Sequence, residues 1–212
     1  ESAGDGAGTS VAQAGDHDGD GLRDLLVGAP GEDSGGSGAG AAYAVSGMEL
    51  GSVDLSSALA KFTGESAGDA AGSALAPGGD LNGDGIDDIL VGAYVADSGG
   101  SDAGAAYVVL GPASGTSSLS DAVAQILGGA EDDNAGWSIS TGGDFDGDGN
   151  DDVLVGAPYE DSAGTNAGAA YLVYGPLSGS ILASAGGATF VGEAAGDGAG
   201  YAVASAGDHD GD

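Results

Sequence analysis

Three acidic nine-residue segments decide the fold of this chain: DHDGDGLRD at residues 16–24, DLNGDGIDD at residues 80–88 and DFDGDGNDD at residues 144–152. Successive segments begin 64 residues apart, and a fourth one begins at residue 208. A motif that recurs at a constant interval of this length predicts a repeat architecture, in which each period forms one supersecondary unit.

The sequence on either side of these segments keeps the same interval. LLVGA, ILVGA and VLVGA follow the three segments, and GAAYAV, GAAYVV and GAAYLV come next. We therefore divide the chain into repeats at residues 1–64, 65–128 and 129–192, with the beginning of a fourth repeat at residues 193–212.

Each repeat reads as a set of short strands. In the first repeat, apolar runs at residues 10–14, 25–29, 41–45 and 61–63 are bounded by Gly, Asp, Pro and Ser. The best helical candidates, residues 55–60 and 119–127, hold at most a turn or two. This pattern predicts an all-β fold of β-propeller blades with four antiparallel strands each, as a partial propeller or part of a longer array. A β-solenoid is the competing geometry, although its coils usually repeat over a shorter span.

The acidic segments have the spacing of a metal loop. Carboxylate or amide side chains recur at loop positions 1, 3, 5 and 9, and glycine at position 6 lets the carbonyl of position 7 face an ion. Calcium takes six to eight such oxygen ligands, so we predict about one Ca²⁺ per complete repeat. The candidate ligands are Asp16, Asp18, Asp20, Leu22 and Asp24; Asp80, Asn82, Asp84, Ile86 and Asp88; Asp144, Asp146, Asp148, Asn150 and Asp152; and Asp208, Asp210 and Asp212.

Other interpretations of these loops are weighed against calcium binding. Asp and Gly also form ordinary turns whose carboxylates face water. An EF-hand requires Glu at position 12 and flanking helices, but Val27, Val91 and Val155 occupy that position. Asn82 removes one negative charge from the second loop, which predicts weaker binding there.

Further recurring side chains have two possible roles each. Asp33, Asp97 and Asp161 are expected either to ligate a second ion or to accept a hydrogen bond within their own turn, and we favour the turn. The aspartates at positions 5, 69, 133 and 197 are expected to be solvated turn residues. Trp137 is either a ligand-stacking platform or, as we favour, a packing residue on a strand face.

Composition excludes several classes of function. The chain has 34 Asp and Glu against two Lys and Arg, a formal charge of −32, and no Cys. Such a charge repels nucleic acid and anionic membranes, and no apolar run is long enough for direct membrane insertion. With two histidines at a non-ligand loop position and only two basic residues, no catalytic group assembles, so we expect no enzyme.

These residues resemble the FG-GAP repeats of integrin α-subunit propellers, in which a DxDxDGxxD calcium loop leads into a strand with the sequence Gly-Ala-Pro. That sequence stands at residues 28–30 and 156–158, whereas Tyr94 replaces the proline of the second repeat. The FG element departs from the family pattern, because Ala-Gly stands at residues 7–8, 71–72, 135–136 and 199–200. The resemblance implies a seven-bladed propeller in an extracellular protein, with calcium in hairpin loops.

We therefore expect a calcium-binding extracellular or cell-surface module with a structural or adhesive role. Its expected partners are calcium, a protein, matrix or surface glycan ligand, and further copies of itself joined head to tail. Millimolar extracellular calcium fills weak loops that cytosolic calcium leaves empty, which is the basis for the expected location. A carbohydrate-binding lectin propeller and a non-catalytic accessory domain of a larger secreted enzyme are the alternatives.

Overall fold

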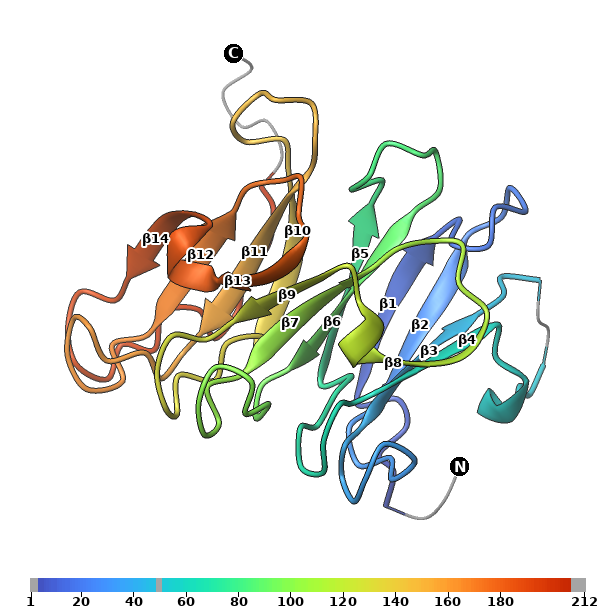
Figure 1. Ribbon diagram of the computed structural model, residues 1–212, viewed down its shortest axis with the longest axis horizontal. Coiled ribbons are helices and arrows are strands. Elements are labelled where there is room, and N and C mark those ends of the chain that lie inside the picture. Colours follow the sequence, from blue (N-terminus) through green and yellow to red (C-terminus); the bar gives the residue numbers. More distant parts are fainter. Residues whose placement is uncertain (1–3, 49–50, 207–212) are drawn as a thin grey trace.

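The computed structural model describes residues 4–48 and 51–206, which form an all-β fold (Figure 1). The first repeat contributes β1 (Ser10–Gly15), β2 (Asp24–Ala29), β3 (Ala41–Val45) and β4 (Ala60–Thr63). The second contributes β5 (Ala74–Gly79), β6 (Asp88–Ala93), β7 (Ala105–Val109), β8 (Gly115–Ser118) and β9 (Ala124–Leu127). The third contributes β10 (Ser138–Gly143), β11 (Asp152–Ala157), β12 (Ala169–Val173), β13 (Gly179–Leu182) and β14 (Gly187–Val191).

The strands form three sheets that stand side by side, as propeller blades do (Figure 1). Blade 1 is built on β1 to β4, blade 2 on β5, β6, β7 and β9, and blade 3 on β10, β11, β12 and β14, each as an antiparallel meander. The first strands of neighbouring blades pack together, β1 against β5 and β5 against β10. The four-stranded antiparallel blades predicted from the sequence are confirmed.

A fifth strand crosses from each repeat to the blade before it. β8 belongs to the second repeat but pairs in parallel with β4 of blade 1, and β13 of the third repeat pairs in parallel with β9 of blade 2. These two strands are not predicted from the sequence, because GTSS and GSIL lie in the variable segments between the apolar runs and carry no alternating pattern. The sheets are therefore offset from the 64-residue sequence repeats.

The core consists of apolar side chains packed between the blades. One cluster joins blades 1 and 2 and includes Phe62, Ile89 and Tyr107, each at most 2% exposed. A second cluster joins blades 2 and 3 around Ile126, Val153 and Tyr171. Ala71, at the place of the family's aromatic residue, is fully buried. Side chains from adjacent repeats thus complete one another's cores, as the repeat architecture requires.

Glycine allows the closest approach between blades. A Cβ added at Gly28 would overlap the carbonyl oxygen of Gly72, and one added at Gly92 would overlap that of Gly136. The glycine of the Gly-Ala-Pro sequence is therefore required by contact with the next repeat.

The helical segments are single 3₁₀ turns: η1 (Leu55–Ser57), η2 (Leu119–Asp121) and η3 (Ala183–Ala185). They confirm that residues 55–60 and 119–127 hold no more than a turn of helix. None of the helices among the described residues is long and apolar enough to cross a membrane.

Candidate metal-binding loops

The acidic segments are the hairpin loops between the first two strands of each blade. They connect β1 to β2, β5 to β6 and β10 to β11, and all three lie at the same end of the blades (Figure 1). Just before each loop the ladder contains a bulge, at Gly15, Gly79 and Gly143, each with a positive φ of 69° to 82°. The bulge glycine turns the chain away from the ladder and into the loop.

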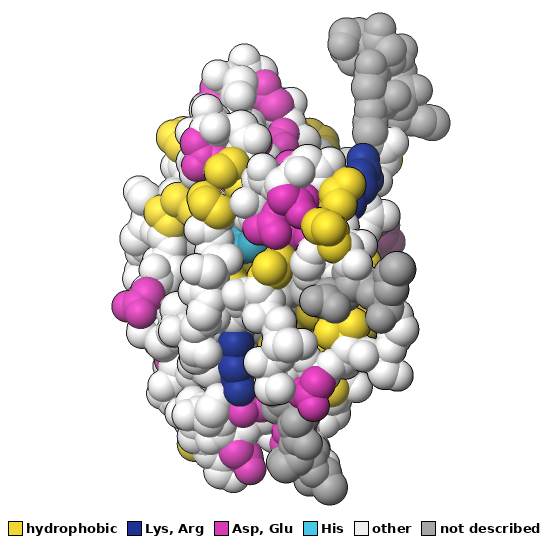
Figure 2. Space-filling model, turned by 90° about the vertical axis from the view of Figure 1, so that its right-hand side faces the viewer, with side chains coloured by type: hydrophobic (Ala, Val, Ile, Leu, Met, Phe, Trp, Pro, Cys, Tyr) yellow, Lys and Arg dark blue, Asp and Glu magenta, His cyan; other side chains and the backbone are white. Residues whose placement is uncertain are grey.

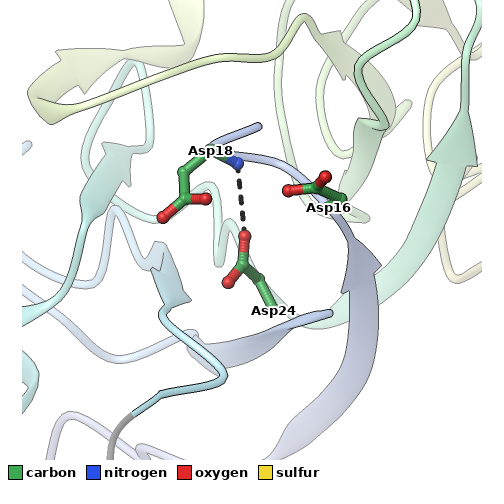
Figure 3. Close-up of side chains that lie close together, drawn as sticks. All are labelled: Asp16, Asp18 and Asp24. Atoms are coloured by element: carbon green, nitrogen blue, oxygen red, sulfur yellow. Dashed lines mark hydrogen bonds between the residues drawn. The ribbon is translucent and has the colours of Figure 1, made fainter. Parts of the chain in front are cut away.

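Three carboxylates converge in the first and third loops. Asp16, Asp18 and Asp24 each place an oxygen within 4.8 Å of the others (Figure 3), and Asp144, Asp146 and Asp152 do the same. These residues occupy loop positions 1, 3 and 9. The second loop has only two carboxylates at these positions, Asp80 and Asp88, because Asn82 supplies an amide at position 3.

The aspartate at position 9 also holds the fold together. Asp24 is fully buried; its Oδ2 accepts the His17 N–H at 3.0 Å and its Oδ1 accepts the Gly47 N–H at 3.1 Å. The same two bonds recur at Asp88, to Leu81 and Gly111, and at Asp152, to Phe145 and Gly175. Position 9 thus fixes the loop against the chain that follows the third strand of the blade.

Positions 1 and 5 shape the loop through the backbone. Asp16 Oδ2 accepts the Gly21 N–H at 2.9 Å, and Asp20 Oδ1 accepts the Leu22 N–H at 2.8 Å. The corresponding bonds form in the second and third loops. Asp20 and Asp148 lie outside the converging groups, and the position 7 residues donate their N–H to position 5. Asp208, Asp210 and Asp212 fall outside the described residues.

Negative charge in these loops is only partly compensated. Burial raises the pKa of Asp18, and the neighbouring carboxylates of Asp24, Asp20 and Asp16 raise it further, against one backbone hydrogen bond. Burial likewise raises the pKa of Asp88 to about 6. Asp16 Oδ1 is buried with no hydrogen-bond partner. Clustered oxygen donors, one of them an orphaned buried oxygen, fit a hard cation such as Ca²⁺.

Asp87 contacts the first loop, although the sequence does not predict this role. Asp87, at position 8 of the second loop, accepts the Asp16 N–H with Oδ2 at 2.7 Å, and its carbonyl oxygen lies 2.9 Å from His17 Nδ1. A carboxylate of blade 2 thus braces the acidic loop of blade 1. The signal in the sequence was the recurrence of Asp at position 8 in the second and third repeats, as Asp87 and Asp151.

The other recurring aspartates are turn residues. Asp33, Asp97 and Asp161 each accept the N–H five residues later, at 2.7 to 2.9 Å, as favoured from the sequence. The expectation that the earlier group is solvated is wrong for three members, because Asp5, Asp69 and Asp133 are 4% exposed. Asp69 and Asp133 each accept the N–H of the residue three positions earlier, at 2.8 Å.

Trp137 belongs to an aromatic cluster instead of standing alone. Its ring packs edge to face against Tyr94, Tyr159 and Tyr201, with centroids 4.7 to 5.8 Å apart. The hydroxyl of Tyr201 donates to that of Tyr159 at 2.8 Å. This arrangement supports the packing role, since the rings contact one another across the second, third and fourth repeats. The predicted strand face is wrong, because Trp137 lies in the bend directly before β10.

Comparison with models of known families finds the FG-GAP repeat at residues 7–45, 71–109 and 135–173, together more than half of the chain. Each match begins at the Ala-Gly pair, contains the acidic loop and ends with the third strand of a blade. No curated protein matches the chain.

Proposed function

Because this chain belongs to the FG-GAP repeat family, we propose that it is a calcium-binding repeat module with a structural or adhesive role outside the cell. In this proposal calcium holds each hairpin loop in shape, and the rigid array of blades presents its variable loops to a protein, matrix or glycan ligand. FG-GAP repeats are typical of extracellular and cell-surface proteins.

The converging carboxylates carry the calcium proposal. Asp16, Asp18 and Asp24 meet within 4.8 Å although each would repel the others when ionised. At this separation two like charges repel by about 1 kcal/mol even in bulk water and by more near a protein surface. With a bound cation, the attraction between each carboxylate and the ion outweighs this repulsion.

The residues that would hold the ion also connect the blade. Asp24 bonds the loop to Gly47, two residues after β3, and the Asp16 N–H donates to Asp87 of the next blade. An ion at Asp16, Asp18 and Asp24 would therefore tighten a hairpin, a blade and a joint between blades together. At a calcium concentration ten times the dissociation constant, binding stabilises the folded state by about 1.4 kcal/mol per site.

The proposal assigns no catalytic role. His17 is fully buried against Phe62, with its ring centroid 6.2 Å away, so its imidazole is not available to a substrate. Arg23 donates to Gln13 and Lys61 is paired with Glu32 at 2.8 Å, which leaves both described cations engaged.

Titration calorimetry with calcium tests the proposal, together with thermal unfolding in millimolar calcium and in excess chelator. We expect about one Ca²⁺ per complete repeat and a clear rise in the unfolding temperature. The double variant Asp18→Asn, Asp146→Asn should weaken binding to the first and third loops. Asp33→Asn, which alters an acidic turn outside the loops, is the matched control. Equal binding by both variants, or an unfolding temperature insensitive to calcium, would contradict the proposal.

A lectin is the second candidate, favoured by the aromatic cluster. Tyr201 is 48% exposed beside Trp137, and exposed aromatic rings stack on sugars. A glycan array probed with the wild-type chain and with Tyr201→Ala separates the two proposals. Sugar binding that the substitution abolishes would favour the lectin, whereas calcium-dependent stability without sugar binding would favour the structural module.

A further inference from the structure

The second acidic loop contains the one asparagine of the chain that is followed by glycine. Asn82 and Gly83 stand at loop positions 3 and 4, where the other two loops have Asp18 and Asp146 followed by glycine. In an Asn-Gly pair the amide nitrogen of the glycine attacks the asparagine side chain with no side chain of its own in the way. Position 3, where the second loop differs from the others, is therefore also where it is chemically least stable.

The structure leaves this pair open to reaction. Asn82 and Gly83 are both exposed, and a Cβ added at Gly83 would meet no atom within 4 Å outside the adjoining residues. Among the described residues, no hydrogen bond engages the Gly83 N–H, whereas the equivalent Gly147 N–H donates to Asp144 Oδ1 at 2.8 Å. The nitrogen that acts as nucleophile is free, and a cyclic product has room to form.

The side-chain carbonyl of Asn82 is polarised by its own loop. Its Oδ1 accepts the Asp84 N–H at 2.8 Å, and its Nδ2 donates to Asp84 Oδ2 at 3.0 Å. A backbone N–H aimed at a carbonyl oxygen stabilises the negative charge that develops there during nucleophilic attack. The hydrogen bond to Oδ1 therefore makes the adjacent carbon more electrophilic.

The three other asparagines lack this combination of features. The backbone N–H groups that follow Asn134 and Asn166 each donate to a backbone carbonyl oxygen at 2.9 Å. Asn150 is followed by Asp151, whose side chain hinders attack and whose negative charge opposes loss of the amide proton. Asn82 is thus the asparagine that is exposed, followed by glycine and next to an unbonded N–H.

We propose that Asn82 deamidates spontaneously and that its aspartyl product gives the second loop the three carboxylates of the first and third loops. The Gly83 nitrogen gives up its proton and attacks Cγ of Asn82, the bond from Cγ to Nδ2 breaks, and ammonia leaves a cyclic imide. Water then opens the imide at either carbonyl. One opening gives aspartate, and the other gives isoaspartate, in which the main chain runs through the side-chain carbon. The overall reaction consumes water and releases ammonia.

Either product adds a negative charge to a chain with few basic side chains. Acidic side chains outnumber basic ones on the side of the molecule shown in Figure 2, and Arg23 and Lys61 already pair with Gln13 and Glu32. The consequence for calcium rests on the proposed function. The aspartyl product should bind Ca²⁺ more tightly, because ligand charge raises calcium affinity. The isoaspartyl product lengthens the loop backbone and should bind it less tightly.

Peptide mass spectrometry of the aged protein tests the site. The folded chain is incubated in mildly alkaline buffer with chelator, and cleavage after Glu65 and Glu131 separates Asn82 from the other asparagines. We expect the mass increase of an amide-to-acid conversion to appear several-fold faster in this peptide than in those with the other asparagines. Isomerisation at Asp-Gly pairs leaves the mass unchanged. If Asn82 reacts only in urea, or no faster than the others, the proposal is overturned.

A variant and a binding measurement separate the modification from its effect on calcium. Asn82→Gln, whose longer side chain does not readily close the imide ring, should stay intact in the same peptide. Ion exchange should isolate an aspartyl form whose calcium affinity, measured by calorimetry, equals that of Asn82→Asp. An aspartyl form that binds calcium less tightly than Asn82→Asp would overturn the conversion. Deamidation in chelator, with calcium affinity unchanged in both forms, would support the modification and count against the calcium proposal instead.

Discussion

The acidic residues of each loop differ in what they contact, and this difference determines the effect of replacing them. Asp24 is buried and accepts three backbone N–H groups, whereas Asp18, at position 3, accepts the N–H of Asp20 within its own loop. Position 9 therefore contributes to stability even without an ion. Position 3 has the weaker structural role and is the better place to alter metal affinity.

Asn82→Asp is predicted to strengthen calcium binding at the second loop. The substitution restores the third carboxylate that converges in the other two loops, and added ligand charge raises calcium affinity. Calorimetry should show the weakest site gaining roughly tenfold in affinity, about 1.4 kcal/mol. The chelated protein should become slightly less stable, because a new carboxylate faces Asp80 and Asp88. A stable variant with unchanged affinity would show that position 3 is not a ligand.

Asp87→Ala is predicted to weaken the joint between blades 1 and 2. It removes the carboxylate that accepts the Asp16 N–H at 2.7 Å. Hydrogen bonds to charged groups contribute about 1.5–3 kcal/mol, and chemical denaturation should register a loss of that order. Arg23→Ala changes the same repeat position where no described blade precedes it, so its effect should stay within about 0.5 kcal/mol. Similar losses for both variants would contradict the bracing role of Asp87.

At the scale of strands, identical repeat positions experience different environments. Phe62 on β4 is 2% exposed because blade 2 covers it, and Phe190 on β14 is 56% exposed because no described blade does. Phe62→Ala should destabilise the fold by about 3–5 kcal/mol, the usual result for a buried phenylalanine. Phe190→Ala in dilute protein should cost less than about 1 kcal/mol. The difference between the two variants in denaturant unfolding measures how much the contact between blades 1 and 2 contributes to stability. Equal losses would contradict a stabilising role for this contact.

The sequence predicts the strands whose apolar residues recur in every repeat. It does not predict the strands that are stabilised by pairing with a strand of the preceding blade. LLVGA and GAAYAV identify β2 and β3, since their apolar side chains suffice to indicate burial. GTSS at β8 has no apolar pattern, because the backbone of β4 supplies its stabilising contacts. Asp87 was missed for the same reason: its partner, Asp16, lies in another repeat. The loop carboxylates were predictable because their partners lie within nine residues.

At the scale of the whole molecule, buried carboxylates govern the response to pH. Burial raises the pKa of Asp88 from 3.8 to about 6, and burial also raises the pKa of Asp69, Asp133 and Asp152. At pH values between the ordinary pKa of 3.8 and the raised pKa of about 6, the folded state binds more protons than the unfolded state. The free energy of unfolding therefore falls as pH rises through this range.

Without calcium, the unfolding temperature should therefore fall between about pH 4 and pH 6 and change less above that. Calcium should reduce this fall, because the ion replaces the proton as the compensating charge. Circular dichroism melts across this range, with and without calcium, provide the measurement. Asp88→Asn should flatten the curve of the calcium-free protein. A calcium-free curve that rises with pH would contradict the assignment of protons to the buried carboxylates.

The crossing strands also impose an order on synthesis. β8 begins more than fifty residues after β4 ends, so during translation blade 1 keeps an open edge until most of the second repeat has emerged. At ordinary elongation rates this delay is about 3–10 seconds. Each newly made repeat closes the edge of the one before it and opens its own. The nascent chain thus exposes a single unfinished edge that travels with the growing end.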